Sequence, residues 1–113
     1  MRNKNGIVRK QVMSRSVFTF PYSSAEKSGI LINNILISNK FTQHMENEGV
    51  VWKKGSALLT GEQCIKIEWG ENEVKIFGWI SDGFSESQLS GFLGSYAKGK
   101  VLKVIEQLKL SII

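Results

Sequence analysis

The sequence has few of the residues that cross-link small domains or hold metal ions. It contains one cysteine, Cys64, one histidine, His44, and one proline, Pro21, among 113 residues. A single cysteine cannot form an internal disulfide, which favours a reducing compartment and predicts a cytoplasmic location. A zinc site needs three or four His, Cys or carboxylate ligands, so we expect neither a metal nor another cofactor.

Long apolar stretches are also missing. We find no run of about 18 apolar residues that could span a bilayer. The basic residues near the N-terminus are not followed by the apolar segment of a signal peptide. The composition, 42% hydrophobic and 22% charged, is typical of a folded protein. A chain of this length is expected to form one domain.

Acidic residues are absent from the first fifteen positions. Five basic residues stand there: Arg2, Lys4, Arg9, Lys10 and Arg15. Residues 16–113 contain ten lysines and ten acidic residues, so the net charge of +5 lies entirely in the first segment. We expect residues 1–15 to be a flexible basic arm and residues 16–113 to be a single α+β domain with a neutral surface.

The pattern of apolar residues predicts strands and helices in a definite order. Strands are expected at residues 12–20, 41–45, 50–53, 57–60, 64–69 and 73–81, and helices at 25–37 and 95–110. The last two strands alternate apolar and polar residues on either side of Gly70-Glu71-Asn72, which predicts a hairpin. Ser23 or Ser24 can cap the first helix, and Glu26 can form a capping box with Ser23. The wide apolar stripe of this helix predicts that it is covered on more than one side.

This order predicts an α+β fold. We expect an antiparallel sheet of about five to six strands with two helices on one face, in the order β-α-β4(5)-α. The layout resembles that of the TATA-binding-protein-like fold, which hosts many unrelated functions.

Short patterns between Phe18 and Leu108 resemble a family of small bacterial domains of uncharacterised function, known mainly from Gram-positive genomes. The matching patterns are Val51-Trp52-Lys53-Lys54-Gly55-Ser56, Leu59-Thr60, Ile65-Lys66-Ile67, Gly78-Trp79-Ile80 and Leu89-Ser90-Gly91-Phe92-Leu93-Gly94, before a lysine-bearing C-terminal helix. The resemblance implies the fold and no activity. Members of the family often carry the domain beside a zinc ribbon or a membrane segment, and this sequence contains neither.

Catalytic motifs are incomplete. Cys64 and His44 could form a nucleophile–base pair only if the fold brings them together, and a packed or unreactive cysteine on a strand face that can be exposed is favoured. Leu89-Ser90-Gly91 lacks the first glycine of a Gly-x-Ser-x-Gly motif. Gly99-Lys100-Val101 lacks the Ser or Thr of a phosphate-binding Gly-Lys-Ser motif. We therefore expect that the protein is not an enzyme.

Two groups of residues remain as candidate interaction sites. The apolar group interrupts the Gly- and Ser-rich segment 82–94 and consists of Phe84, Leu89, Phe92 and Leu93. These side chains either close the core, which we favour, or form a contact patch for self-association or a protein partner. The basic group could contact an anion and consists of Arg9, Lys10, Arg15, Lys98, Lys100 and Lys103.

The leading interpretation is a non-catalytic binding or protein-interaction module. The alternative is a nucleic-acid-binding domain that uses the basic arm and the final helix. A solvated helix face is the simplest explanation of the lysines in that helix. Attachment to a membrane surface would be weak, because so few charges contribute.

Overall fold

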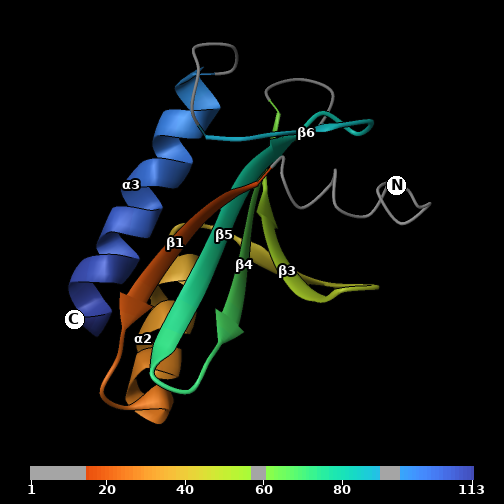
Figure 1. The fold of residues 1–113 in the computed structure, drawn as a ribbon. Coiled ribbons are helices and arrows are strands. Elements are labelled where there is room, and N and C mark those ends of the chain that lie inside the picture. Colours follow the sequence, from red (N-terminus) through yellow and green to blue (C-terminus); the bar gives the residue numbers. More distant parts are fainter. Residues whose placement is uncertain (1–14, 57–60, 90–94) are drawn as a thin grey trace.

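In the computed structural model, which describes residues 15–56, 61–89 and 95–113, six strands and two helices follow one another (Figure 1). Their order is the predicted one, except that a two-residue strand, Glu86–Ser87, lies where no strand was predicted. The elements are β1 (Ser16–Pro21), α2 (Ala25–Ser38), β2 (Thr42–Glu46), β3 (Gly49–Lys54), β4 (Glu62–Trp69), β5 (Glu73–Ser81), β6 (Glu86–Ser87) and α3 (Ser95–Ile112). The α+β prediction is confirmed. The strand predicted at 57–60 and residues 1–14 of the predicted arm lie outside the described residues.

The strands form one antiparallel sheet in the order β1-β5-β4-β3-β2, and β6 pairs with the end of β5. The predicted hairpin is its centre: β4 and β5 pair along their whole length, with Ile65 opposite Gly78 and Cys64 opposite Trp79. Because side chains alternate across a strand, this register sends Ile65 and Gly78 to one face and Cys64 and Trp79 to the other.

Both helices lie on the Ile65 face of the sheet, and they contact each other (Figure 1). Fully buried aliphatic side chains from both layers meet there, and they include Ile32, Leu36, Ile65, Val74, Ile76, Val101 and Leu108. Burial of this apolar surface is the main stabilising contribution to the fold. Neither helix in the described part of the chain has the length and apolar character needed to cross a membrane.

The first helix differs from its prediction in two respects. Ser24 is its N-cap and accepts a hydrogen bond from the amide of Lys27, so Glu26 lies too early for the predicted capping box with Ser23. The prediction of cover on more than one side is wrong. Only one stripe of α2 is buried, whereas the side chain of Ile37 on its outer surface is 60% exposed.

The second helix packs unusually close to the sheet at Gly78. A Cβ atom at this position would lie 2.8 Å from Cδ1 of Leu89 and 2.9 Å from Cδ1 of Ile105, with Val101 at 3.2 Å. The absence of a side chain at Gly78 thus lets α3 and Leu89 rest directly on the centre of β5.

We expect Gly78→Ala to lower the free energy of unfolding by about 1–3 kcal/mol, because the methyl group overpacks the core. Gly99→Ala is the matched control. Nothing lies within 4 Å of a Cβ there, and the change should raise stability by about 0.5–1 kcal/mol through helix propensity. Urea unfolding of both variants measures the difference. Equal effects of the two substitutions would contradict the close packing at Gly78.

Candidate anion-binding pocket

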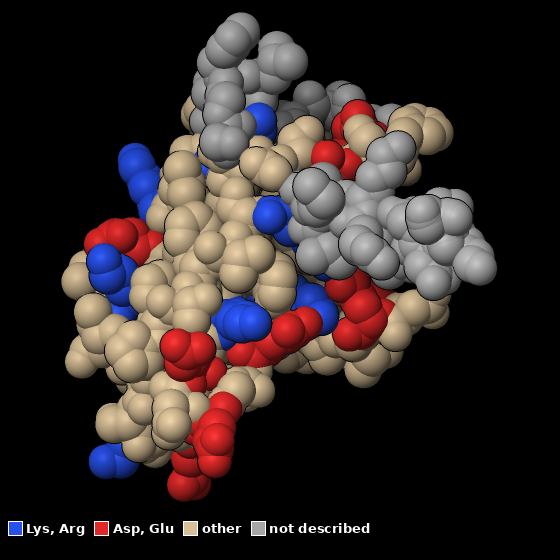
Figure 2. All heavy atoms as spheres, in the orientation of Figure 1, with Lys and Arg blue, Asp and Glu red and all other residues tan. Residues whose placement is uncertain are grey.

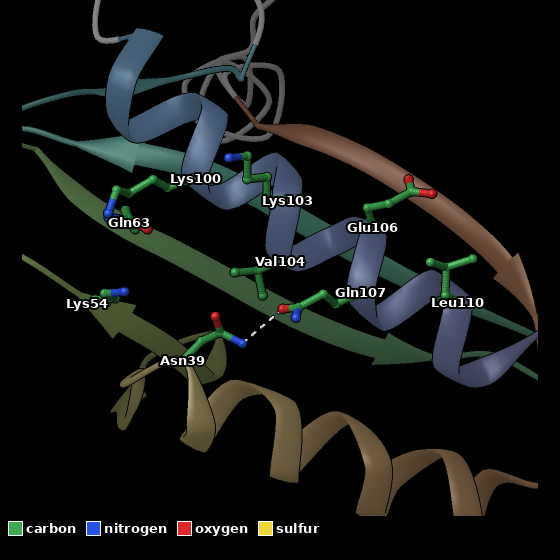
Figure 3. Close-up of a pocket in the computed structure, with 9 residues that line it drawn as sticks. All are labelled: Asn39, Lys54, Gln63, Lys100, Lys103, Val104, Glu106, Gln107 and Leu110. Atoms are coloured by element: carbon green, nitrogen blue, oxygen red, sulfur yellow. Dashed lines mark hydrogen bonds between the residues drawn. The ribbon is translucent and has the colours of Figure 1, made fainter.

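A pocket opens where the C-terminal end of α2, one side of α3 and the helix-facing side of β3 and β4 meet (Figure 3). Its volume is about 520 Å³, which is within the range of small-molecule sites. The lining residues are Asn39 from the end of α2, Lys54 from β3, Gln63 from β4, and Lys100, Lys103, Val104, Glu106, Gln107 and Leu110 from α3.

The side of α3 that lines the pocket follows from its sequence spacing. Lys100, Lys103, Val104, Gln107 and Leu110 recur at intervals of three and four, which places them along one side of a helix. At 1.5 Å per residue, the row from the first to the last is roughly 15 Å long. The pocket therefore has the form of an elongated groove with lysines at one end and Leu110 at the other (Figure 3).

Three lysines from two elements face this pocket, and none of them forms an ion pair with another described residue. The ammonium of Lys100 lies 5.0 Å from the ring centre of Tyr96, and that of Lys54 lies 5.8 Å from the ring centre of Phe41. Figure 2 shows that acidic and basic side chains are intermixed on the face in view. The pocket is thus a local concentration of positive charge on a domain whose charges balance.

The floor of the pocket contains an unsatisfied polar group. Gln63 is only 7% exposed, and its Oε1 has no hydrogen-bond partner among the described residues. An acceptor buried in this way costs about 1–3 kcal/mol of stability. A water molecule, or a ligand with an N–H or O–H donor, would satisfy it.

One wall of the pocket is held by an amide pair between the two helices. Nδ2 of Asn39 donates hydrogen bonds to Oε1 of Gln107, at 3.0 Å, and to the carbonyl of Ile35, at 2.8 Å (Figure 3). Asn39 is also the C-cap of α2. The end of α2 is therefore fixed to α3 at the mouth of the pocket.

The opposite face of the sheet has a different arrangement around Arg15. Its guanidinium donates two hydrogen bonds to Glu48, at 2.6 and 2.9 Å, and two to Glu86, at 2.9 and 2.8 Å. It also stacks 3.6 Å from the ring centre of Trp79. We call Arg15, Glu48, Glu86 and Trp79 the Arg15 clamp. The clamp ties the start of β1 to β6 and to the turn between β2 and β3.

The clamp shifts the ionisation of its members. Burial lowers the pKa of Arg15, but hydrogen bonds and charge attraction from Glu86 and Glu48 outweigh it and raise the pKa above its ordinary value. The hydrogen bonds from Arg15 hold the pKa of Glu48 below its ordinary value, against the opposing effect of partial burial. Arg15, the last residue of the predicted flexible arm, is thus paired within the folded domain and is not free to contact a nucleic acid.

The fold does not assemble a Cys–His pair. Cys64 is buried beside Val51 and Trp79, and its thiol donates to the carbonyl of Glu62 at 3.6 Å. His44 is exposed and its Nε2 shares a hydrogen bond with the hydroxyl of Thr42. The idea that Cys64 lies on an exposed face is wrong, because the clamp side of the sheet has its own small apolar cluster. In the described part of the chain, no three His, Cys, Asp or Glu residues gather as metal ligands.

The remaining predicted residues lie in different environments. Leu89 is 5% exposed and belongs to the core, whereas Phe84, five residues earlier, is 95% exposed in a turn. Lys98 is buried, while Lys100 and Lys103 line the pocket. Four further candidates, Arg9, Lys10, Phe92 and Leu93, lie outside the described residues.

Sequence reasoning missed the pocket residues outside α3. Lys54 is a basic residue two positions after Trp52, so alternation along a strand could have placed both on the same face. Gln63 gave no signal, because a glutamine at the start of a strand is ordinary. Its significance comes only from burial without a hydrogen-bond partner.

We expect Arg15→Gln to lower the free energy of unfolding by about 1–3 kcal/mol at pH 7, because charge-assisted hydrogen bonds and the Trp79 contact are lost. The pKa of Glu48 is lower in the folded than in the unfolded state, so its contribution is present above about pH 4.5 and disappears as the pH falls through the folded value. Urea unfolding at pH 7 and pH 3 should show a smaller difference between wild type and variant at pH 3. An unchanged difference would contradict the clamp.

We expect Cys64 to resist alkylation in the folded protein. Burial is the largest cause that raises the pKa of its thiol to about 12, and the thiolate is the reactive form. Iodoacetamide at pH 8 should modify the native chain many times more slowly than the chain in urea, with mass spectrometry as the measurement. Similar rates under both conditions would mean that the thiol is accessible.

Comparison of the chain with protein-family models, with curated proteins and with solved structures gave no match. The resemblances to a bacterial domain family and to the TATA-binding-protein-like fold therefore stay predictions.

Proposed function

We propose that this chain is a non-catalytic binding module of the cytoplasm that holds a small anionic ligand in the pocket between α3, the end of α2 and the β3–β4 surface. The observation that carries the proposal is the convergence of Lys54, Lys100 and Lys103 around one pocket without a carboxylate partner among the described residues.

The physical reason is the repulsion between like charges. Three ammonium groups around one pocket disfavour each other, and the low-dielectric wall formed by Val104 and Leu110 strengthens their field. An anion would relieve this repulsion and accept hydrogen bonds from the same groups. Two lysines on the clamp side of the sheet are paired within the protein. Lys66 pairs with Glu68 at 2.6 Å, and Lys53 pairs with Glu46 at 3.0 Å.

One observation favours nucleic acid as a second candidate. The exposed Tyr96 and the ammonium of Lys100, which also lines the pocket, form a basic–aromatic pair on α3. Such pairs bind single strands through phosphate contacts and base stacking. The paired state of Arg15 weakens this candidate, because one cation of the predicted arm is already neutralised.

We expect Lys54→Gln, Lys100→Gln and Lys103→Gln each to weaken the binding of a phosphorylated small molecule by roughly five- to thirtyfold, since each removes a charge-assisted hydrogen bond of about 1–2 kcal/mol. Glycerol 3-phosphate is the probe, and amide chemical shifts in a titration give the affinity. Lys109→Gln is the matched control, because it removes the same charge from α3 at a position that does not line the pocket.

Three outcomes separate the candidates. Weakening in the three pocket variants but not in Lys109→Gln supports the pocket. Equal weakening in all four variants indicates only the attraction of net charge and contradicts the proposal. Binding of a short single-stranded DNA that falls steeply with salt, together with no response to glycerol 3-phosphate, would favour nucleic acid instead.

A further inference from the structure

The buried amide of Gln63 and the charge balance of the lining residues restrict the class of ligand that fits the pocket. This inference rests on the proposed function. It concerns the chemical groups that the anion must carry in addition to its negative charge.

The first restriction comes from the buried oxygen of Gln63. Its Oε1 is an acceptor with no partner in the described part of the chain, and an anionic oxygen beside it would be repelled. A ligand group that meets this oxygen, as distinct from the NH2 group of the same amide, must therefore donate a hydrogen bond. A bare oxyanion without a proton satisfies the lysines but leaves this oxygen unsatisfied.

The second restriction comes from net charge. Lys54, Lys100 and Lys103 carry three positive charges, and Glu106 on the same lining carries one negative charge. The lining is therefore +2 by this sum of formal charges. A phosphate monoester carries about −1.5 to −2 at pH 7, which matches this excess better than the single charge of a carboxylate.

The third restriction comes from the order of side chains along the groove. Figure 3 shows Gln63 and Lys100 at the same end of the pocket, and Leu110 at the other end. The hydrogen-bond donor of the ligand must therefore lie close to its anionic group, and an uncharged part can extend along Val104 toward Leu110.

We propose that the pocket takes a phosphate monoester whose carbon skeleton carries a hydroxyl group close to the phosphate, the chemistry of sugar and polyol phosphates. The lysines hold the phosphate oxygens. The hydroxyl donates its hydrogen bond to Oε1 of Gln63, and the carbon skeleton lies against Val104.

A matched pair of ligands tests this inference on the unmodified chain. Glycerol 3-phosphate carries hydroxyl groups next to the phosphate ester, and n-propyl phosphate has the same three-carbon skeleton and charge without them. We expect glycerol 3-phosphate to bind about tenfold more tightly in an amide-shift titration, because only it can satisfy the buried acceptor.

The variant Gln63→Met supplies the second half of the experiment. It keeps the length of the side chain and removes the acceptor, so the two ligands should bind to it with equal affinity. Equal affinity of the two ligands for the unmodified chain would overturn this inference and leave the anion pocket in place. No response to either ligand or to inorganic phosphate would overturn the proposed function itself. If the Gln63→Met variant fails to fold, the comparison of the two ligands on the unmodified chain still tests the inference.

Discussion

The close contact between α3 and the centre of β5 at Gly78 is the constraint on which the rest of the structure depends. Without a side chain there, Val101 and Ile105 of the helix and Leu89 of the preceding segment rest on the middle of the sheet. This contact sets how closely α3 approaches the centre of the sheet. Lys100 belongs to the same helix, next to Val101. The close packing at Gly78 therefore also limits the position of Lys100 relative to β3 and β4.

The two faces of the sheet are stabilised by different kinds of interaction. On the helix side, apolar burial between layers dominates. On the other side, a planar guanidinium covers an aromatic ring and is held by two carboxylates. Arginine suits this task because it can form paired hydrogen bonds and stack at the same time. Arg15, Lys53 and Lys66 on this face all pair with glutamates, whereas the three lysines around the pocket form no ion pair with another described residue.

The pocket carries two features that lower stability. Three lysines share one pocket without acidic partners among the described residues, and Gln63 has a buried acceptor with no hydrogen bond. A domain of this size has only a small margin of stability. Unpaired charges and unsatisfied buried polar groups that lie close together are typical of functional sites, where a ligand compensates for them. The amide pair of Asn39 and Gln107 joins the two helices at the edge of this pocket.

The sequence by itself determined the α+β class, the β4–β5 hairpin and the amphipathic final helix, because periods of two and of 3.6 residues report which side of an element is apolar. It could also show that Lys100 and Lys103 share one side of that helix. Only the tertiary structure decided that Lys54 joins them, that Arg15 is paired with Glu48 and Glu86, that Ile37 is exposed and that Gln63 is buried without a partner. These facts depend on contacts between residues far apart in the chain, and local periodicity carries no information about the partner that an element meets.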